Sequence, residues 1–186
     1  RCSVVSVDVV RCLAVQGRGP GRSLMSGVRE RIYPVGRLDY HTRGLLLMTN
    51  DGALSDAMTH PRSKVEKVYH VKFQGILTPD ALKALKEGVV LEDGVKTQPA
   101  TEAFAIRTTE TNTWVQLGIV QGLHRQIRRM GDAIDFQVLK LIRVSIDSLG
   151  TEGLGEGHFR ALTQTEVESL RAHIARVAAV RPGQRR

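Results

Sequence analysis

The chain has 186 residues, with 27 Lys or Arg against 19 Asp or Glu, which gives a formal net charge of +8. That length suits one domain with a substantial core, and apolar runs such as residues 45–48 fall far short of the ~18 residues that a membrane-spanning helix needs, which excludes a transmembrane protein. The positive charge favours a polyanionic partner, most simply nucleic acid. The two cysteines, at positions 2 and 12, predict neither a disulfide framework nor a structural zinc site, so a cytoplasmic location is expected.

Periodicity, turn signals and capping residues predict the elements. Alternating or β-branched runs favour strands, and helical spacing after a capping residue favours helices. The clearest signals are the turn Asn50-Asp51-Gly52, the helix start Thr78-Pro79 and the capping box Thr163-x-x-Glu166. In chain order, they predict strands at 32–35 and 45–49, a helix at 53–59, a strand at 67–73, a helix at 81–87, strands at 103–107 and 113–120, a basic helix at 124–130, a strand at 138–146 and a helix from 164 to about 174.

Strands outnumber helices and hairpin connections dominate, which predicts an α+β fold with a mostly antiparallel mixed sheet and flanking helices. Residues 1–30 are expected to be a flexible or truncated segment with a basic linker at 17–23, although the apolar run at 1–12 could be a strand, and residues 175–186 are expected to be a basic tail. Residues 31–174 would form the single domain. Because residue 1 is Arg rather than Met, we expect a chain that has lost its beginning.

A polar run with unusual chemical content lies between the first two predicted strands. Residues 36–44 read Gly-Arg-Leu-Asp-Tyr-His-Thr-Arg-Gly, with Asp39 as the carboxylate. A carboxylate that a nearby arginine keeps ionised can act as a nucleophile or a base. An ordinary solvated loop accounts for the same residues, and without further information it is the favoured interpretation.

Two basic segments follow. Within residues 64–72, Tyr69 is flanked by lysines, which suits stacking on a nucleic-acid base, although a strand tyrosine more often belongs to a core. Residues 121–130 contain arginines that could neutralise phosphates or turn inward to a carboxylate, and a solvated basic face is the alternative. Three of them are expected to share one helix face at i, i+3 and i+4 spacing: Arg125, Arg128 and Arg129.

The sequence predicts no metal and no nucleotide cofactor. The six histidines are scattered and none has the spacing of metal ligands. Gly153-Leu154-Gly155-Glu156-Gly157 has neither the spacing nor the strand-to-helix context of a dinucleotide fingerprint, and the sequence contains no Walker loop.

Taken together, these segments resemble a known family. Residues 36–52, from Gly36-Arg37-Leu38-Asp39 to Asn50-Asp51-Gly52, resemble the catalytic motif of the RsuA/RluB-type ribosomal RNA pseudouridine synthases. Further motifs of that family are matched in the same order at residues 67–71, 121–130, 138–144 and 157–163. The resemblance covers roughly residues 31 to 174.

The resemblance implies the pseudouridine synthase catalytic fold and an enzyme that converts a uridine in ribosomal RNA to pseudouridine without any cofactor. Asp39 would be the catalytic carboxylate, either as a covalent nucleophile or along a glycal route. Tyr69 would stack on the target base, with Leu141 on the opposite wall. Arg128 would pair with Asp39 and lower its pKa, and Arg37 would help to displace the base or bind phosphate.

Ribosomal RNA is the expected partner, from the large subunit rather than the small, and the chain is expected to be a monomer without membrane contact. Departures from the family pattern are the missing S4 domain and Lys-Pro-x-Gly segment in residues 1–30, Gln121 in place of an acid, and His41 in place of Asp or Asn. Further RNA contacts are expected at Lys64, Lys67, His124, Arg125, Arg129 and Arg143.

Two other functions compete with the enzyme. In the first, the chain is a non-catalytic RNA-binding remnant of such an enzyme, which keeps the fold and the basic surface but not turnover. In the second, the carboxylate acts at a sugar's anomeric carbon as in a glycoside hydrolase. That reaction needs a second carboxylate as general acid, and no motif supplies one.

Overall fold

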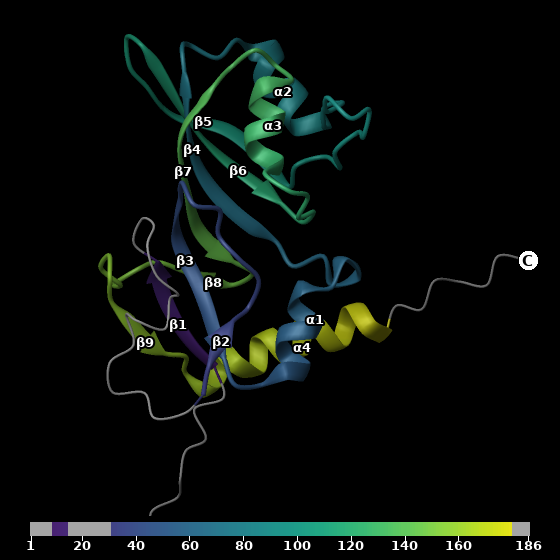
Figure 1. The fold of residues 1–186 in the computed structure, drawn as a ribbon, viewed down its shortest axis with the longest axis vertical. Helices are drawn as coiled ribbons and strands as arrows, with labels where there is room; N and C mark the ends of the chain where they lie inside the picture. The colour runs from purple at the N-terminus through teal and green to yellow at the C-terminus, as the bar shows by residue number, and fades with distance from the viewer. Residues whose placement is uncertain (1–8, 15–30, 180–186) are drawn as a thin grey trace, which may run out of the picture.

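The computed structural model describes residues 9–14 and 31–179 (Figure 1). Cys2, the predicted linker at 17–23 and the tail residues 180–186 lie outside the described residues. Within them, the strands form one nine-stranded sheet in the order β5-β6-β4-β7-β3-β1-β9, with β2 paired to β3 and β8 to β7. The elements are β1 (Val9–Ala14), β2 (Tyr33–Pro34), β3 (Thr42–Thr49), α1 (Gly52–Thr59), η2 (Pro61–Ser63), β4 (Lys67–Gln74), α2 (Pro79–Glu87), β5 (Glu102–Thr108), β6 (Asn112–Ile119), α3 (Gln126–Asp132), β7 (Val138–Ile146), β8 (Leu149–Gly150), β9 (Phe159–Ala161) and α4 (Gln164–Ala179).

The α+β prediction is confirmed. Each strand and helix predicted from residue 32 onward is found within a few residues of its expected bounds. Among the described strand pairs, β3 and β7 run parallel and the others antiparallel, so the sheet is mixed. The short elements η2, β8 and β9 had no signal in the sequence, because two or three residues are too few to show a period.

A strand in the amino-terminal segment, which the sequence left open, is present as β1. β1 lies between β3 and β9 and pairs antiparallel with both. The flexible segment expected over residues 1–30 therefore does not include Val9–Ala14. No turn residues frame this apolar run, and its partner strands lie far away in the sequence, so local patterns could not reveal the pairing.

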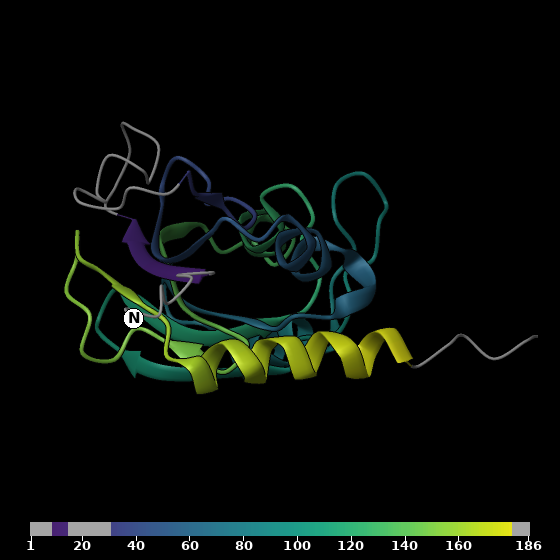
Figure 2. The same ribbon diagram turned by 90° about the horizontal axis from the view of Figure 1, so that it is seen from below.

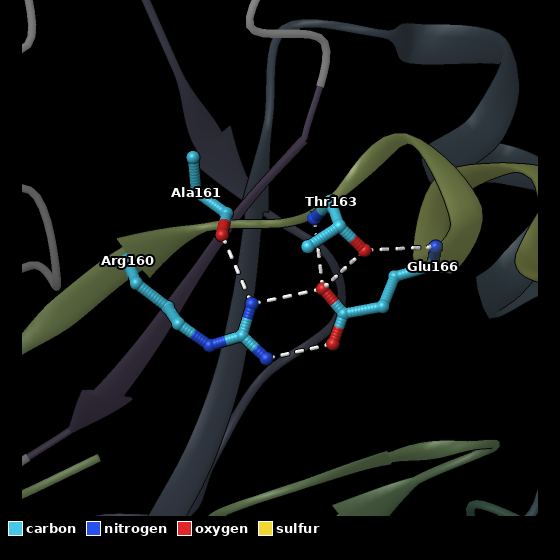
Figure 3. Close-up of polar contacts among 4 residues, drawn as sticks. All are labelled: Arg160, Ala161, Thr163 and Glu166. Carbon is cyan, nitrogen blue, oxygen red and sulfur yellow. Dashed lines mark hydrogen bonds and ion pairs between the residues drawn. The ribbon is translucent and has the colours of Figure 1, made fainter. Parts of the chain in front are cut away.

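The last helix begins at the predicted capping box. Glu166 Oε2 accepts from the Thr163 main-chain N–H at 2.8 Å, and Thr163 Oγ1 accepts from Glu166 N–H at 3.2 Å. Arg160, on β9, adds a bidentate ion pair with Glu166 at 2.6 and 2.8 Å (Figure 3). α4 then continues to Ala179, beyond the expected end near residue 174, since the next helix-breaking residue in the sequence is Pro182.

The core is divided into two clusters along the sheet. One lies between β4, β6 and β7 and the helices α2 and α3, and the other joins β3 to α1 and α4. Figure 1 shows α2 and α3 beside the upper strands and α1 and α4 at the lower end of the sheet. Figure 2, seen from below, shows α4 running across this lower end. Phe73 and Leu85 are fully buried in the first cluster. Burial of each such side chain contributes about 1.5–3 kcal/mol to the stability of the fold.

Candidate active site

The Asp39 loop connects β2 to β3. Its turn is closed by a hydrogen bond of 2.8 Å from the Thr42 N–H to the Asp39 carbonyl. The Asp39 side chain is half-buried, whereas Tyr40 beside it is 62% exposed. The tight return into β3 therefore holds this carboxylate just before the start of that strand rather than in a free loop.

Arg143 supports the main chain before Asp39. This residue, on β7, is only 3% exposed, and its Nε donates to the Leu45 carbonyl at 2.8 Å. Its Nη1 donates to the carbonyl of Arg37 at 3.5 Å, while its Nη2 has no hydrogen-bond partner among the described residues. A buried guanidinium with a spare donor is available for a ligand acceptor.

Arg128 supports the main chain after Asp39. Its Nη2 donates to the His41 carbonyl at 3.1 Å and its Nη1 to the Val138 carbonyl at 2.9 Å. The expected ion pair with Asp39 is not formed among the described residues, and the Nε of Arg128 is buried there without a hydrogen-bond partner. Burial lowers the pKa of Arg128, and the charge of Arg125 lowers it further, whereas Asp39 acts in the opposite direction.

A pocket of about 600 Å³ opens beside Asp39. Tyr69 and Leu141, from β4 and β7, are 9% and 6% exposed and form part of its apolar lining. Lys64, Arg128 and Arg129 are not among the described residues that line it. The predicted site residues that it brings together are Arg37, Asp39, Lys67, Tyr69, His124, Arg125, Leu141 and Arg143.

The pocket has a positive wall. Lys67 is half-buried at the start of β4, where its Nζ donates to the Val65 carbonyl at 2.9 Å. Burial lowers the pKa of Lys67, and the nearby charge of Arg143 lowers it further. Two cations this close in a partly desolvated pocket favour an anionic ligand.

The arginine-rich segment differs from the prediction. α3 begins only at Gln126, and Arg125 precedes it in a left-handed conformation with φ 48°. Arg129 forms ion pairs with Glu92 at 2.6 Å and Asp93 at 2.5 Å. The three arginines therefore do not share one face: Arg125 faces the pocket, Arg128 holds main-chain carbonyls, and Arg129 is neutralised by a loop that is distant in sequence.

Some residues of the pocket were not predicted to be site residues. Thr42 is 6% exposed and lines the pocket, and its Oγ1 has no partner among the described residues. Gln98 and Gln121 also line the pocket, and the Gln98 N–H donates to Gln121 Oε1 at 3.0 Å. A buried hydroxyl without a partner can be recognised only in three dimensions.

The described residues contain no group of three or more His, Cys, Asp or Glu that could hold a metal ion. Within the same residues, none of the helices has the length and apolar character needed to span a membrane.

Comparisons with known proteins give a consistent result. A family model described as RNA pseudouridylate synthase matches residues 22–133. Ribosomal large subunit pseudouridine synthase B of Bacillus subtilis (strain 168) is 40% identical over 158 residues, which are 84% of this chain and 64% of that protein. Ribosomal large subunit pseudouridine synthase E of Xanthomonas axonopodis pv. citri (strain 306) is 35% identical, over 82% of this chain and 88% of that one.

A solved structure is also similar. It is described as the crystal structure of a pseudouridylate synthase and superposes with a TM-score of 0.78 at 30% identity, over 88% of this chain and 73% of that one. The chain thus spans less than two thirds of the Bacillus relative's length but most of the Xanthomonas relative's.

Proposed function

The chain belongs to the RNA pseudouridylate synthase family, and on that premise we propose that it converts a uridine of ribosomal RNA to pseudouridine, with Asp39 as the catalytic carboxylate. The observation that carries the proposal is the pocket of about 600 Å³, in which Asp39 lies with Tyr69, Leu141 and Arg143. A carboxylate, two apolar walls and a buried cation in one cavity suit a flipped nucleotide.

The proposed reaction is an isomerisation. The bond between C1′ of the ribose and N1 of the uracil breaks, the uracil turns in the pocket, and a bond forms between C1′ and C5. The hydrogen on C5 leaves as a proton and N1 gains one, so the product has the composition of the substrate. Asp39 acts on the ribose, either by attacking C1′ or along a glycal route, and both routes agree with a half-buried carboxylate.

The pocket supplies groups for each part of the nucleotide. Tyr69 and Leu141 would enclose the uracil and keep water away while it turns. Thr42 Oγ1 and Arg143 Nη2 lack partners among the described residues, so the hydroxyl could pair with a polar atom of the base or the sugar and Arg143 would donate to one of their oxygens. Lys67 and Arg37 would attract the flanking phosphates.

The proposed target is a uridine of large-subunit ribosomal RNA. The support is that the relatives from Bacillus and Xanthomonas are both named for the large subunit. We expect the chain to act in the cytoplasm as a monomer, without a cofactor.

The test is to incubate the full chain with unmodified transcripts of the large- and small-subunit RNAs and to map pseudouridines by chemical labelling and primer extension. We expect pseudouridine in the large-subunit transcript and none in the small. If the chain binds the transcripts but forms no pseudouridine in either, its function is non-catalytic RNA binding instead.

A further inference from the structure

The sheet has a second face that the active site does not use. Tyr69, Val71 and Phe73 of β4 point into the core cluster that α2 and α3 cover. Because side chains alternate along a strand, His70 and Lys72 point to the opposite face. Both are half-exposed rather than buried, so this face of β4 is open to solvent at its centre.

Strand register places one continuous row of side chains across this face. Lys72 lies opposite Trp114 of β6 and, on its other side, opposite Lys140 of β7. Trp114 in turn lies opposite Arg107 of β5. Directly opposed residues share a face, so four adjacent strands present a row that we call the basic row: Arg107, Trp114, Lys72 and Lys140. With strands ~4.8 Å apart, it is roughly 15 Å long.

The charges in the basic row lack compensation. Lys72 and Lys140 are like charges directly opposite each other, an arrangement that destabilises a sheet. Neither they nor Arg107 form an ion pair with any carboxylate of the described residues. An anion that bridges them would convert this repulsion into binding.

Flat apolar groups accompany the cations. Trp114 is half-exposed between Lys72 and Arg107, and Phe104 on the edge strand β5 is 46% exposed. An acid on this face, Glu102, accepts from Gln116 Nε2 at 2.9 Å, and Gln116 Oε1 lies 3.1 Å from His70 Nε2. Aromatic rings between uncompensated cations are the pattern that binds single-stranded nucleic acid, since bases stack while phosphates pair with the cations.

We propose that this face is a second RNA-binding surface, on which a single-stranded segment of RNA stacks on Trp114 and places its phosphates against Lys72, Lys140 and Arg107. It lies on the side of the sheet opposite Tyr69 and the pocket, so it would hold RNA other than the nucleotide that reacts. The surface does not depend on catalysis and can be tested without turnover.

Trp114 makes the test direct, because it is the only tryptophan in the chain. A short oligoadenylate serves as the probe, since it contains no uridine that could react. The full chain is titrated with it at low salt while tryptophan emission is followed. We expect saturable quenching of Trp114, which groups bound in the pocket on the other face would not produce.

A charge variant and a matched control complete the experiment. In Lys72→Gln/Lys140→Gln, we expect the affinity measured by the quenching to fall about 10-fold or more. The slope of the logarithm of affinity against the logarithm of salt concentration should decrease in magnitude by roughly 1.4, because two phosphate contacts are lost. Lys83→Gln/Lys86→Gln removes the same charge from exposed positions of α2, on the other face, and should leave the quenching unchanged.

Three results would overturn the proposal. The first is oligoadenylate binding, seen by fluorescence anisotropy of a labelled probe, that leaves Trp114 emission unchanged. The second is an equal loss of affinity in both double variants. The third is a change in Trp114 emission with protein concentration alone, which would identify a second copy of this chain as the occupant. None of these results bears on pseudouridine formation, so the surface and the proposed function fail separately.

Discussion

The geometry around Asp39 depends on side chains that act on the main chain beside it. Arg143 donates to the carbonyl two residues before Asp39, and Arg128 donates to the carbonyl two residues after it. Each arginine also holds a carbonyl of a neighbouring strand segment, at Leu45 or Val138. The carboxylate is thus held by its flanking peptides, and in the proposed reaction its own oxygens would be available to the ribose.

Arg143→Lys should therefore lower kcat more than it changes KM. Lysine keeps the charge but cannot direct separate donors to the carbonyls of Leu45 and Arg37, and a shift of about 1 Å in a catalytic group costs on the order of 10²-fold in rate. Single-turnover and steady-state kinetics on the same RNA would measure it. Arg160→Lys is the control, because Arg160 binds Glu166 and neither residue lines the pocket. Equal kcat in Arg143→Lys and wild type would refute the positioning role.

Lys67 predicts a distinctive pH dependence of RNA affinity. Its pKa is lowered from 10.5 by burial and by Arg143, so its charge is lost at lower pH than that of an ordinary lysine. The contribution of the Lys67 charge to RNA affinity should be fully present below this lowered pKa and should be lost as pH rises through it. In Lys67→Arg the charge persists, so the alkaline fall should shrink, while titration of the RNA itself is common to both proteins. If the Kd of wild type and of Lys67→Arg changed identically with pH in the alkaline range, Lys67 would be excluded as a phosphate contact.

At the scale of elements, the parallel pairing of β3 with β7 determines where the Asp39 loop meets Tyr69 and Leu141. Gly44 lies opposite Arg143 in this pairing and has φ 111°. A Cβ at this position would overlap the Arg143 main chain. The glycine thus permits the close approach of two strands that carry site residues.

Gly44→Ala should destabilise the chain by more than about 2 kcal/mol, because it adds steric overlap to an unfavourable φ. Urea unfolding followed by circular dichroism would measure the loss. Gly94→Ala is the matched control: its φ is 79°, but a Cβ there meets nothing within 4 Å. That variant should lose only the ~1–2 kcal/mol of stability that the left-handed conformation costs a residue with a Cβ. Equal losses would mean that the β3–β7 approach has no special role.

The contact between β9 and α4 predicts an acid-dependent stability. The ion pair with Arg160 lowers the pKa of Glu166 from 4.5 to about 2, with a further contribution from the Thr163 N–H (Figure 3). Because the folded pKa is depressed, this stabilisation is complete above pH 4.5 and is lost as pH falls towards 2.

Glu166→Gln should lower the free energy of unfolding by about 1–2 kcal/mol at neutral pH, a range that allows for solvent screening of a partly exposed pair. The difference from wild type should shrink on acidification, as measured by urea unfolding at a series of pH values. Glu110→Gln, at an exposed turn between β5 and β6, should show no such difference. A difference for Glu166→Gln that is independent of pH would contradict the depressed pKa.

At the scale of the whole molecule, local patterns predicted the elements well, and the motif resemblance predicted which residues meet. Asp39, Tyr69 and Leu141 come from separate segments, yet all line one pocket. What local patterns could not predict were partners distant in sequence. Arg129 is neutralised by Glu92 and Asp93, an arrangement that depends on how a loop folds back over α3.

The same limit explains the other differences. β1 has no local turn signal and is stabilised by its neighbours on both sides. Thr42 and the side-chain geometry of Arg128 depend on the packing of β3 against β7, which the order of the motifs does not contain. Sequence thus predicted which residues line the pocket better than it predicted their hydrogen bonds.

The most direct test of the central claim is release of tritium from C5-labelled uridine in a large-subunit ribosomal RNA transcript, since only bond formation at C5 expels that hydrogen. Wild type should release tritium in proportion to the pseudouridine formed. Asp39→Asn, which preserves the size of the side chain but removes its charge, should bind the transcript with similar affinity and release none above background. Equal release from both proteins would show that Asp39 is not the catalytic carboxylate.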